Sequence, residues 1–113
     1  VTEIWGIINK KNSFNQIHNH PNTYLSAAYY VNAPDDCGSI QFHEPNEVKK
    51  FRHPVIEKHN ELNSSGFSIK AEEGNLLIFP SYLYHSVAKN LSSEDRVIVS
   101  FNVDIITYKD AKY

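Results

Sequence analysis

Short runs of alternating apolar and polar residues, separated by clusters of turn-forming residues, run along most of the chain. This is the pattern of β-strands rather than of amphipathic helices. Asn, Asp, Ser, Gly and Pro gather between the runs, for instance at 34–38, 63–66 and 90–93. The runs predict strands at Glu3–Asn9, Gln16–Asn19, Thr23–Asn32, Ser39–His43, Phe67–Lys70, Asn75–Phe79, Tyr84–Lys89 and Arg96–Ile105. Many short strands with regular turns predict an all-β sandwich or barrel.

One polar stretch, from Pro45 to Asn63, breaks the strand pattern and contains two prolines. We expect an insertion loop at about 45–63, with a short helix around 54–62. Long loops in compact domains tend to be functional, so this insert is expected to cover a site. At 113 residues the chain has the length of one domain, 1–113.

Composition and charge exclude several classes of function. The net charge is −2 and the lysines form no cluster larger than a pair such as Lys49-Lys50, so there is no basic stripe for nucleic acid. The longest apolar runs, "NLLIFP" and "RVIVSF", fall far below the roughly 18 residues of a membrane helix, and no signal peptide opens the chain. Because Cys37 is the only cysteine, no internal disulfide can form, which predicts a reducing, cytoplasmic compartment.

The start of the sequence is unusual, because a strand-like run opens at Val1 and the chain contains no methionine. We expect a barrel core that lacks its N-terminal elements. A complete minimal domain is the alternative.

Three histidines are candidate metal ligands. His18 and His20 are separated by one residue, and in a strand residues i and i+2 point to the same side, so both rings could converge on one ion. Beside Pro21 they could equally be solvated loop residues. His85 follows the apolar run "NLLIFP" and could be either a core residue or the third ligand.

Arg96 opens the strand "RVIVSFNVDII", whose two faces carry different residues. One interpretation puts the valine face in the core and Arg96 in water. The other puts Arg96 and Ser100 inside the barrel, where an unpaired guanidinium would cost several kcal/mol. No acidic residue in the strand pattern is an obvious partner, whereas a bound dicarboxylate would supply one through two parallel hydrogen bonds.

Five motifs in a fixed order resemble a known family: "HNHP", "LSAAYYVNAP", "GSIQFHEP", "GNLLIFPSYLYHSV" and "DRVIVSFNV". Together they are similar to the 2-oxoglutarate- and iron(II)-dependent oxygenases of marine bacteria and their phages, relatives of the prolyl-hydroxylase-like enzymes. The resemblance runs from about Trp5 to Val103. It implies a double-stranded β-helix, that is, a jelly roll or cupin-like barrel.

The resemblance also implies a metal site. In the wider superfamily the iron is held by an H-x-D/E pair and a distant histidine. His18 matches the first ligand and His85 the distant one, while His20 stands where a carboxylate is expected. The implied enzyme uses iron(II), 2-oxoglutarate and dioxygen to hydroxylate a further substrate.

The implied cosubstrate site lies on two strands. Arg96 matches the basic residue that pairs with the distal carboxylate of 2-oxoglutarate, and Ser100 matches a hydroxyl beside it. Tyr30 resembles a tyrosine that some relatives point at the same carboxylate. Its face-mates Ser26 and Ala28 are small and would leave room for a ligand.

Other interpretations remain open at this point. A cupin-like metal protein shares the spacing of Gly74, Pro80 and His85, although cupins place a glutamate shortly after H-x-H and have no need of the arginine. A non-catalytic jelly-roll module would bind no metal. Three other residues could act as the metal ligand in place of the missing carboxylate: His43, Glu44 and Asp36. The remaining histidines, His53 and His59, are expected to be solvated.

If Arg96 faces the pocket, the opposite face of its strand lies outside the barrel. That face consists of Val97, Val99, Phe101 and Val103. Such a surface requires cover from an N-terminal segment or a second subunit. We therefore predict a homodimer.

Overall fold

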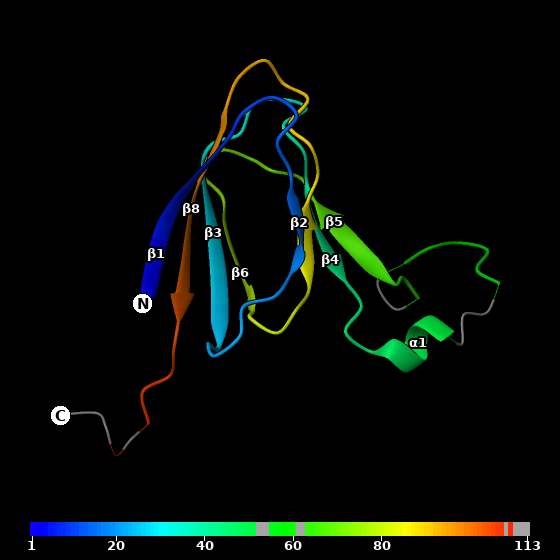
Figure 1. Ribbon diagram of the computed structural model, residues 1–113. Helices are drawn as coiled ribbons and strands as arrows, with labels where there is room; N and C mark the ends of the chain where they lie inside the picture. Colours follow the sequence, from blue (N-terminus) through cyan, green and yellow to red (C-terminus); the bar gives the residue numbers. More distant parts are fainter. Residues whose placement is uncertain (52–54, 61–62, 108, 110–113) are drawn as a thin grey trace.

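The computed structural model describes residues 1–51, 55–60, 63–107 and 109, and these form two antiparallel sheets of four strands each. The strand order is β1-β8-β3-β6 in the first sheet and β2-β7-β4-β5 in the second (Figure 1). The first sheet contains β1 (Glu3–Asn9), β3 (Leu25–Asn32), β6 (Leu76–Pro80) and β8 (Arg96–Val103). The second contains β2 (Asn15–His18), β4 (Ile40–His43), β5 (Gly66–Ile69) and β7 (His85–Val87). The predicted all-β architecture is confirmed.

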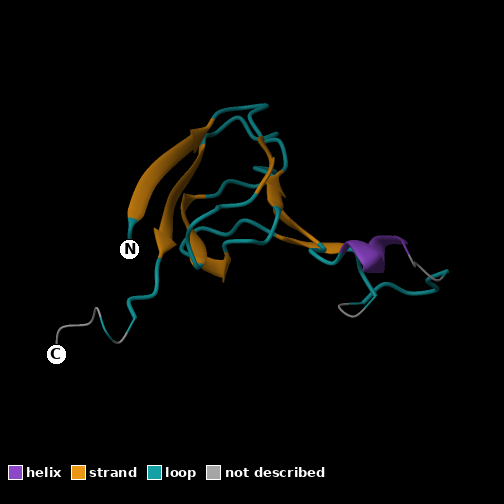
Figure 2. Ribbon diagram, turned by 60° about the horizontal axis from the view of Figure 1, so that its bottom comes forward, coloured by secondary structure: helices purple, strands orange, loops and turns teal. Residues whose placement is uncertain are grey.

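The predicted helix is wrong in position. The short helix α1 covers Glu47–Phe51, and residues 55–60 are not helical. Glu47 lies in its first turn, where a carboxylate is favoured by the helix dipole, and the Asn46 side chain accepts the main-chain N–H of Val48. Figure 2 shows α1 and the adjoining loops projecting from the end of β4, away from the two sheets. That 45–63 is an insertion in one domain stays a prediction.

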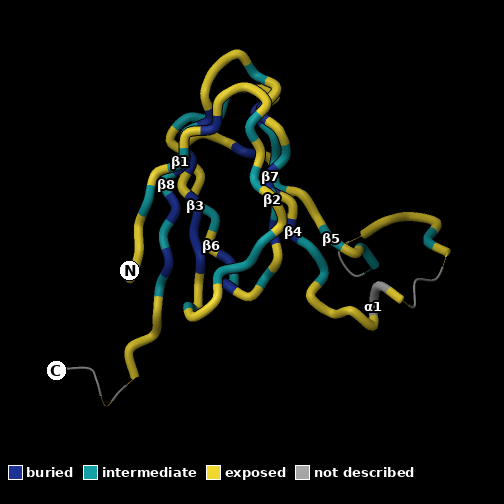
Figure 3. Tube along the Cα trace, viewed as in Figure 1, coloured by how far each residue is buried: buried dark blue, intermediate teal, exposed yellow. Residues whose placement is uncertain are grey.

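The alternation in β8 places Arg96 and Ser100 inside. Burial alternates along the whole strand, with Arg96, Ile98, Ser100 and Asn102 buried and the residues between them only half-buried. The core lies between the sheets, where the buried faces of β3 and β8 meet those of β4 and β7 (Figure 3). Arg96 is fully buried, so the interpretation that places Arg96 and Ser100 inside the barrel is the correct one.

One tight turn closes the end of the molecule near Arg96. The turn contains Asp36 (φ +61°) and Gly38 (φ +89°), both in the left-handed region. A Cβ at Gly38 would overlap the main-chain oxygen of Ala88 and come 2.8 Å from that of Lys89. The turn is therefore packed directly on the residues that follow β7.

Gly38→Ala is expected to lower the free energy of unfolding by about 1–3 kcal/mol, because alanine adds left-handed strain and a clash with the Ala88 carbonyl. Denaturant unfolding measures this change. Gly6→Ala is the matched control, since a Cβ there would meet nothing within 4 Å. Equal stability of the Gly38 variant and wild type would contradict the described packing.

Candidate metal centre

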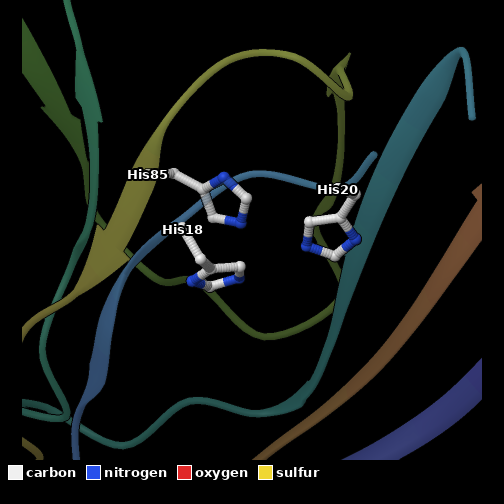
Figure 4. A group of neighbouring side chains, drawn as sticks. All are labelled: His18, His20 and His85. Carbon is white, nitrogen blue, oxygen red and sulfur yellow. The ribbon is translucent and has the colours of Figure 1, made fainter. Parts of the chain in front are cut away.

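The three histidines selected from the sequence lie together between the two sheets. One ring nitrogen from each of His18, His20 and His85 lies within 4.8 Å of the others (Figure 4). The ring centroids are 4.2 Å apart for His18 and His85, and 5.2 Å for each pair that includes His20. No ion pair or hydrogen bond between the rings accounts for these short distances. We therefore interpret the three rings as potential ligands of one ion.

Two different features of the backbone bring the rings together. His18 ends β2 and lies directly opposite His85, the first residue of β7, in the antiparallel register. His20 lies after β2 has ended, on the crossover to the other sheet, where its N–H donates to the Ser81 oxygen at 2.9 Å. The expected same-face geometry of residues i and i+2 is therefore wrong, although the predicted convergence is present.

Each imidazole has one nitrogen already hydrogen-bonded. The Nδ1 atoms of His18 and His85 lie 2.6 Å and 3.0 Å from the main-chain oxygens of Gln16 and Leu83. A carbonyl oxygen can only accept, so both Nδ1 atoms carry the proton and both Nε2 atoms keep a lone pair. An imidazole whose other nitrogen donates to an oxygen is the usual arrangement of a histidine ligand.

Burial keeps two of the rings neutral. It lowers the pKa of His85 from 6.5 to about 4, partly opposed by the bond to Leu83. Burial also lowers the pKa of His20. Phe79 and Phe42 enclose the His85 ring at centroid distances of 4.8 Å and 6.1 Å, and Trp5 stacks on His20 at 5.8 Å. Neutral imidazole is the form that binds a metal, so the centre is prepared for a cation at pH 7.

The cavity beside the rings has a volume of about 210 Å³. Among the residues that line it are the three histidines and the side of the first sheet that carries Tyr30, Ile98 and Ser100. Tyr30 is 1% exposed, and burial raises the pKa of its hydroxyl. No acidic residue belongs to the lining among the described residues.

Arg96 does not belong to the residues that line this cavity. It lies next to Cys37 and Tyr30, which are both buried. Its Nη1 donates to the main-chain oxygens of Cys37, Gly38 and Ala88. Its Nε and Nη2 are buried and have no hydrogen-bond partner among the described residues. Burial lowers the pKa of the guanidinium, and the neighbouring Cys37 and Tyr30 oppose that shift. A buried donor without a partner is costly, so these two nitrogens suit an anionic ligand.

The other candidates lie outside this centre. His43 is half-buried, with Nε2 3.1 Å from the Ser86 hydroxyl, and His59 is exposed as expected. Asp36 is exposed in its turn, and Glu44 accepts the N–H of Asn46. None of them belongs to the group of converging ligand atoms. His53 lies outside the described residues.

Sequence reasoning missed two residues near His20. Asn102 shares the buried face of β8 with Arg96 and Ser100, and its Oδ1 lies 3.1 Å from His20 Nδ1. Trp5, which the sequence pattern does not mark as a site residue, stacks on His20 and lines the cavity. The two-residue spacing along β8 was a usable signal for Asn102, whereas nothing in the sequence pairs Trp5 with position 20.

Comparison with known proteins identifies the family. The family described as "Putative 2OG-Fe(II) oxygenase" matches residues 3–102. The chain belongs to this family. The resemblance to 2-oxoglutarate- and iron(II)-dependent oxygenases is confirmed. No curated protein sequence matches the chain.

Solved structures support the same fold. A 2OG-Fe(II) oxygenase-family oxidoreductase from Burkholderia pseudomallei superposes with a TM-score of 0.66 at 13% identity, over 88% of this chain and 40% of that one. A Pseudomonas putida prolyl-4-hydroxylase gives 0.64 at 14% identity, over 89% and 51%. The non-heme α-ketoglutarate-dependent epimerase SnoN of nogalamycin biosynthesis gives 0.62 at 15%, over 87% and 46%. The double-stranded β-helix is therefore confirmed, and the chain spans about half the length of these proteins or less.

The residues fit the metal that the family implies. Imidazole nitrogens suit iron, and three of them converge here, two on rings whose pKa burial lowers. The unpartnered nitrogens of Arg96 supply what a carboxylate of the cosubstrate would need.

The metal-free protein is expected to lose stability as the pH falls. Unfolded His85 binds a proton near pH 6.5, whereas the folded residue does so only near pH 4. The contribution of His85 to the free energy of unfolding is therefore fully present above pH 6.5 and is lost as the pH falls to about 4. The total loss is roughly 3 kcal/mol. Denaturant unfolding from pH 7.5 to 4 measures the loss.

Two variants separate this contribution from the rest. His85→Gln should flatten the decline between pH 6.5 and 4. The exposed His59→Gln should leave it unchanged. An equal decline in the His85→Gln variant would contradict the assignment.

Proposed function

We propose that the chain is the catalytic core of an oxygenase that couples oxidative decarboxylation of 2-oxoglutarate to hydroxylation of a further substrate. The observation that carries this proposal is the meeting of three imidazoles beside a cavity without acidic residues among the described lining, near a buried guanidinium with two unpartnered nitrogens. In the proposed roles, His18, His20 and His85 hold iron(II), which supplies the activation of dioxygen when bound. Arg96, Ser100 and Tyr30 hold the cosubstrate.

Charge supports a dianion in this cavity. A divalent ion on three neutral ligands keeps its full charge, and Arg96 adds another positive charge nearby. 2-Oxoglutarate carries two carboxylates and can compensate both. Ser100 and Tyr30 both line the same cavity, and a hydroxyl group can donate to a carboxylate oxygen.

The cavity beside the histidines is too small to hold the further substrate, which we therefore place outside it. At about 210 Å³ it is smaller than the roughly 300–1,000 Å³ of ordinary ligand sites. A larger hollow of about 620 Å³ lies between the β4–β5 edge and the predicted insert, lined by Phe42, Leu83 and His59 among others. Phe42 also contacts His85, so we assign the substrate approach to this side.

Alternative functions are less well supported. A non-catalytic module gives no reason for the paired Nδ1 atoms or for the orphaned nitrogens of Arg96. A cupin-like protein would account for the histidines and not for the arginine.

Among the described residues no helix is long and apolar enough to cross a membrane. The cytoplasmic location and the marine bacterial or phage origin stay predictions.

Anaerobic titration with iron(II) and then 2-oxoglutarate tests the proposal. We expect one iron per chain and a weak visible charge-transfer band when 2-oxoglutarate chelates it. Pyruvate, which lacks the distal carboxylate, should bind about 10–100-fold more weakly, as expected for the loss of a charge-assisted pair of roughly 1.5–3 kcal/mol.

Arg96→Lys separates the cosubstrate site from the metal site. Lysine keeps the charge but not the two-pronged geometry, so the preference for 2-oxoglutarate over pyruvate should shrink while iron still binds. A wild-type protein that binds no iron, or that binds both oxoacids equally, would overturn the proposal.

We also propose a homodimer formed through the outer face of the first sheet. Ile4, Ile8 and Ile78 are 68%, 65% and 59% exposed there, and Val99 and Phe101 lie between them in the register. An apolar face of this kind is best covered by another one, and a second copy supplies it.

Light scattering at micromolar concentration should give the mass of a dimer. Ile78→Lys should shift it to the monomer mass, whereas Val48→Lys on α1, where Val48 is similarly exposed at 62%, should not. A monomeric wild-type chain would refute the interface.

A further inference from the structure

His20 differs from the other two imidazoles in what holds it. His18 and His85 bond to main-chain oxygens, which form part of their own segments. The Nδ1 of His20 instead lies 3.1 Å from a side-chain oxygen, Oδ1 of Asn102, which is 82 residues away in sequence. The orientation of this ring therefore depends on one side chain that mutation can remove.

The amide of Asn102 is fixed by its other partners. Its Nδ2 donates to a carboxylate oxygen of Glu3 at 3.0 Å, and its Oδ1 accepts the Ser26 hydroxyl at 3.0 Å. A carboxylate only accepts, so the nitrogen of the amide must face Glu3 and the oxygen must face His20. Since that oxygen only accepts, His20 carries its proton on Nδ1 and keeps the lone pair on Nε2.

Burial strengthens this arrangement. Asn102 is 5% exposed and Ser26 is 1% exposed, so neither polar group can exchange its partner for water at low cost. Trp5 stacks on the His20 ring from the same strand that carries Glu3. The position of a residue on a crossover is thus determined by β1 and β8.

We propose that Asn102 is the positioning residue that allows a histidine to serve as metal ligand at position 20, and that Glu3 acts on it through Asn102. Asn102 fixes the tautomer and the ring orientation, and the Glu3 carboxylate polarises the amide so that its oxygen is a stronger acceptor. This inference rests on the proposed function, because it requires a metal at the three histidines. Outer partners of this kind typically contribute about 10–100-fold to metal affinity.

Equilibrium titration with cobalt(II) measures the effect without turnover. Trp5 is the only tryptophan and contacts His20, so its fluorescence reports the site directly. Asn102→Ala should weaken cobalt binding about 10–100-fold. Glu3→Gln keeps an acceptor for Asn102 but loses the charge that polarises the amide, and because that charge is exposed we expect a smaller loss of about two- to fivefold, so that unchanged affinity would overturn the role of Glu3.

A double variant tests orientation rather than bulk stability. In Asn102→Asp/Glu3→Gln the carboxylate moves to position 102, where it still accepts from His20, and the new amide can donate to it. Cobalt affinity should return to within about threefold of wild type. This variant also keeps the test decisive if Asn102→Ala does not fold, because failure of the double variant to bind cobalt while folded would overturn the inference.

Asn90→Ala is the matched control. Asn90 is also a buried asparagine, 0% exposed, whose side chain donates to the main-chain oxygens of Asn9 and Glu94 at the other end of β1. Its loss should lower stability and leave cobalt affinity unchanged. Equal weakening by Asn90→Ala and Asn102→Ala, or wild-type affinity in Asn102→Ala, would overturn the positioning role. Absence of cobalt binding in wild type would instead overturn the proposed function.

Discussion

The hydrogen bond that each ligand imidazole makes through Nδ1 is the interaction on which the centre depends. Two of these bonds end on main-chain oxygens and the third on Asn102, and together they leave the lone pair on the Nε2 of each ring, in a group where one nitrogen per ring lies within 4.8 Å of the others. Burial between the sheets lowers the pKa of His85 and His20, which favours neutral rings even though the charge of Glu3 acts in the opposite direction on His20. The fold thus supplies geometry and protonation state together.

The absence of a carboxylate among the three converging ligands shapes the electrostatics of the cavity. Arg96 is fully buried, and its Nη1 donates to the main-chain oxygens of Cys37 and Gly38 at the end of a tight turn. Two of its nitrogens stay unpartnered, which stores an unfavourable energy that an anionic ligand would relieve. In the described part of the chain, hydrogen bonds link the carboxylate of Glu3 to His20, two bonds away through Asn102.

The strands could be predicted because alternation along the chain is typical of a strand with two different faces. Alternation left open which face of β8 points inward, and the resemblance selected the face of Arg96 and Ser100, to which the two-residue spacing adds Asn102. His18 and His85 required a cross-strand register, which the resemblance supplied and the sequence pattern did not. His20 was selected for a geometry it does not have, since β2 ends before it. The helix was misplaced because α1 starts from local capping at Asn46, whereas the prediction followed Pro54.

X-ray absorption spectroscopy of the anaerobic iron(II) protein tests the central claim most directly, because imidazole rings give a characteristic multiple-scattering pattern. Three coordinated imidazoles per iron are predicted for wild type, and two for His20→Ala. Two imidazoles with a protein carboxylate in wild type, or an unchanged spectrum in His20→Ala, would contradict the account.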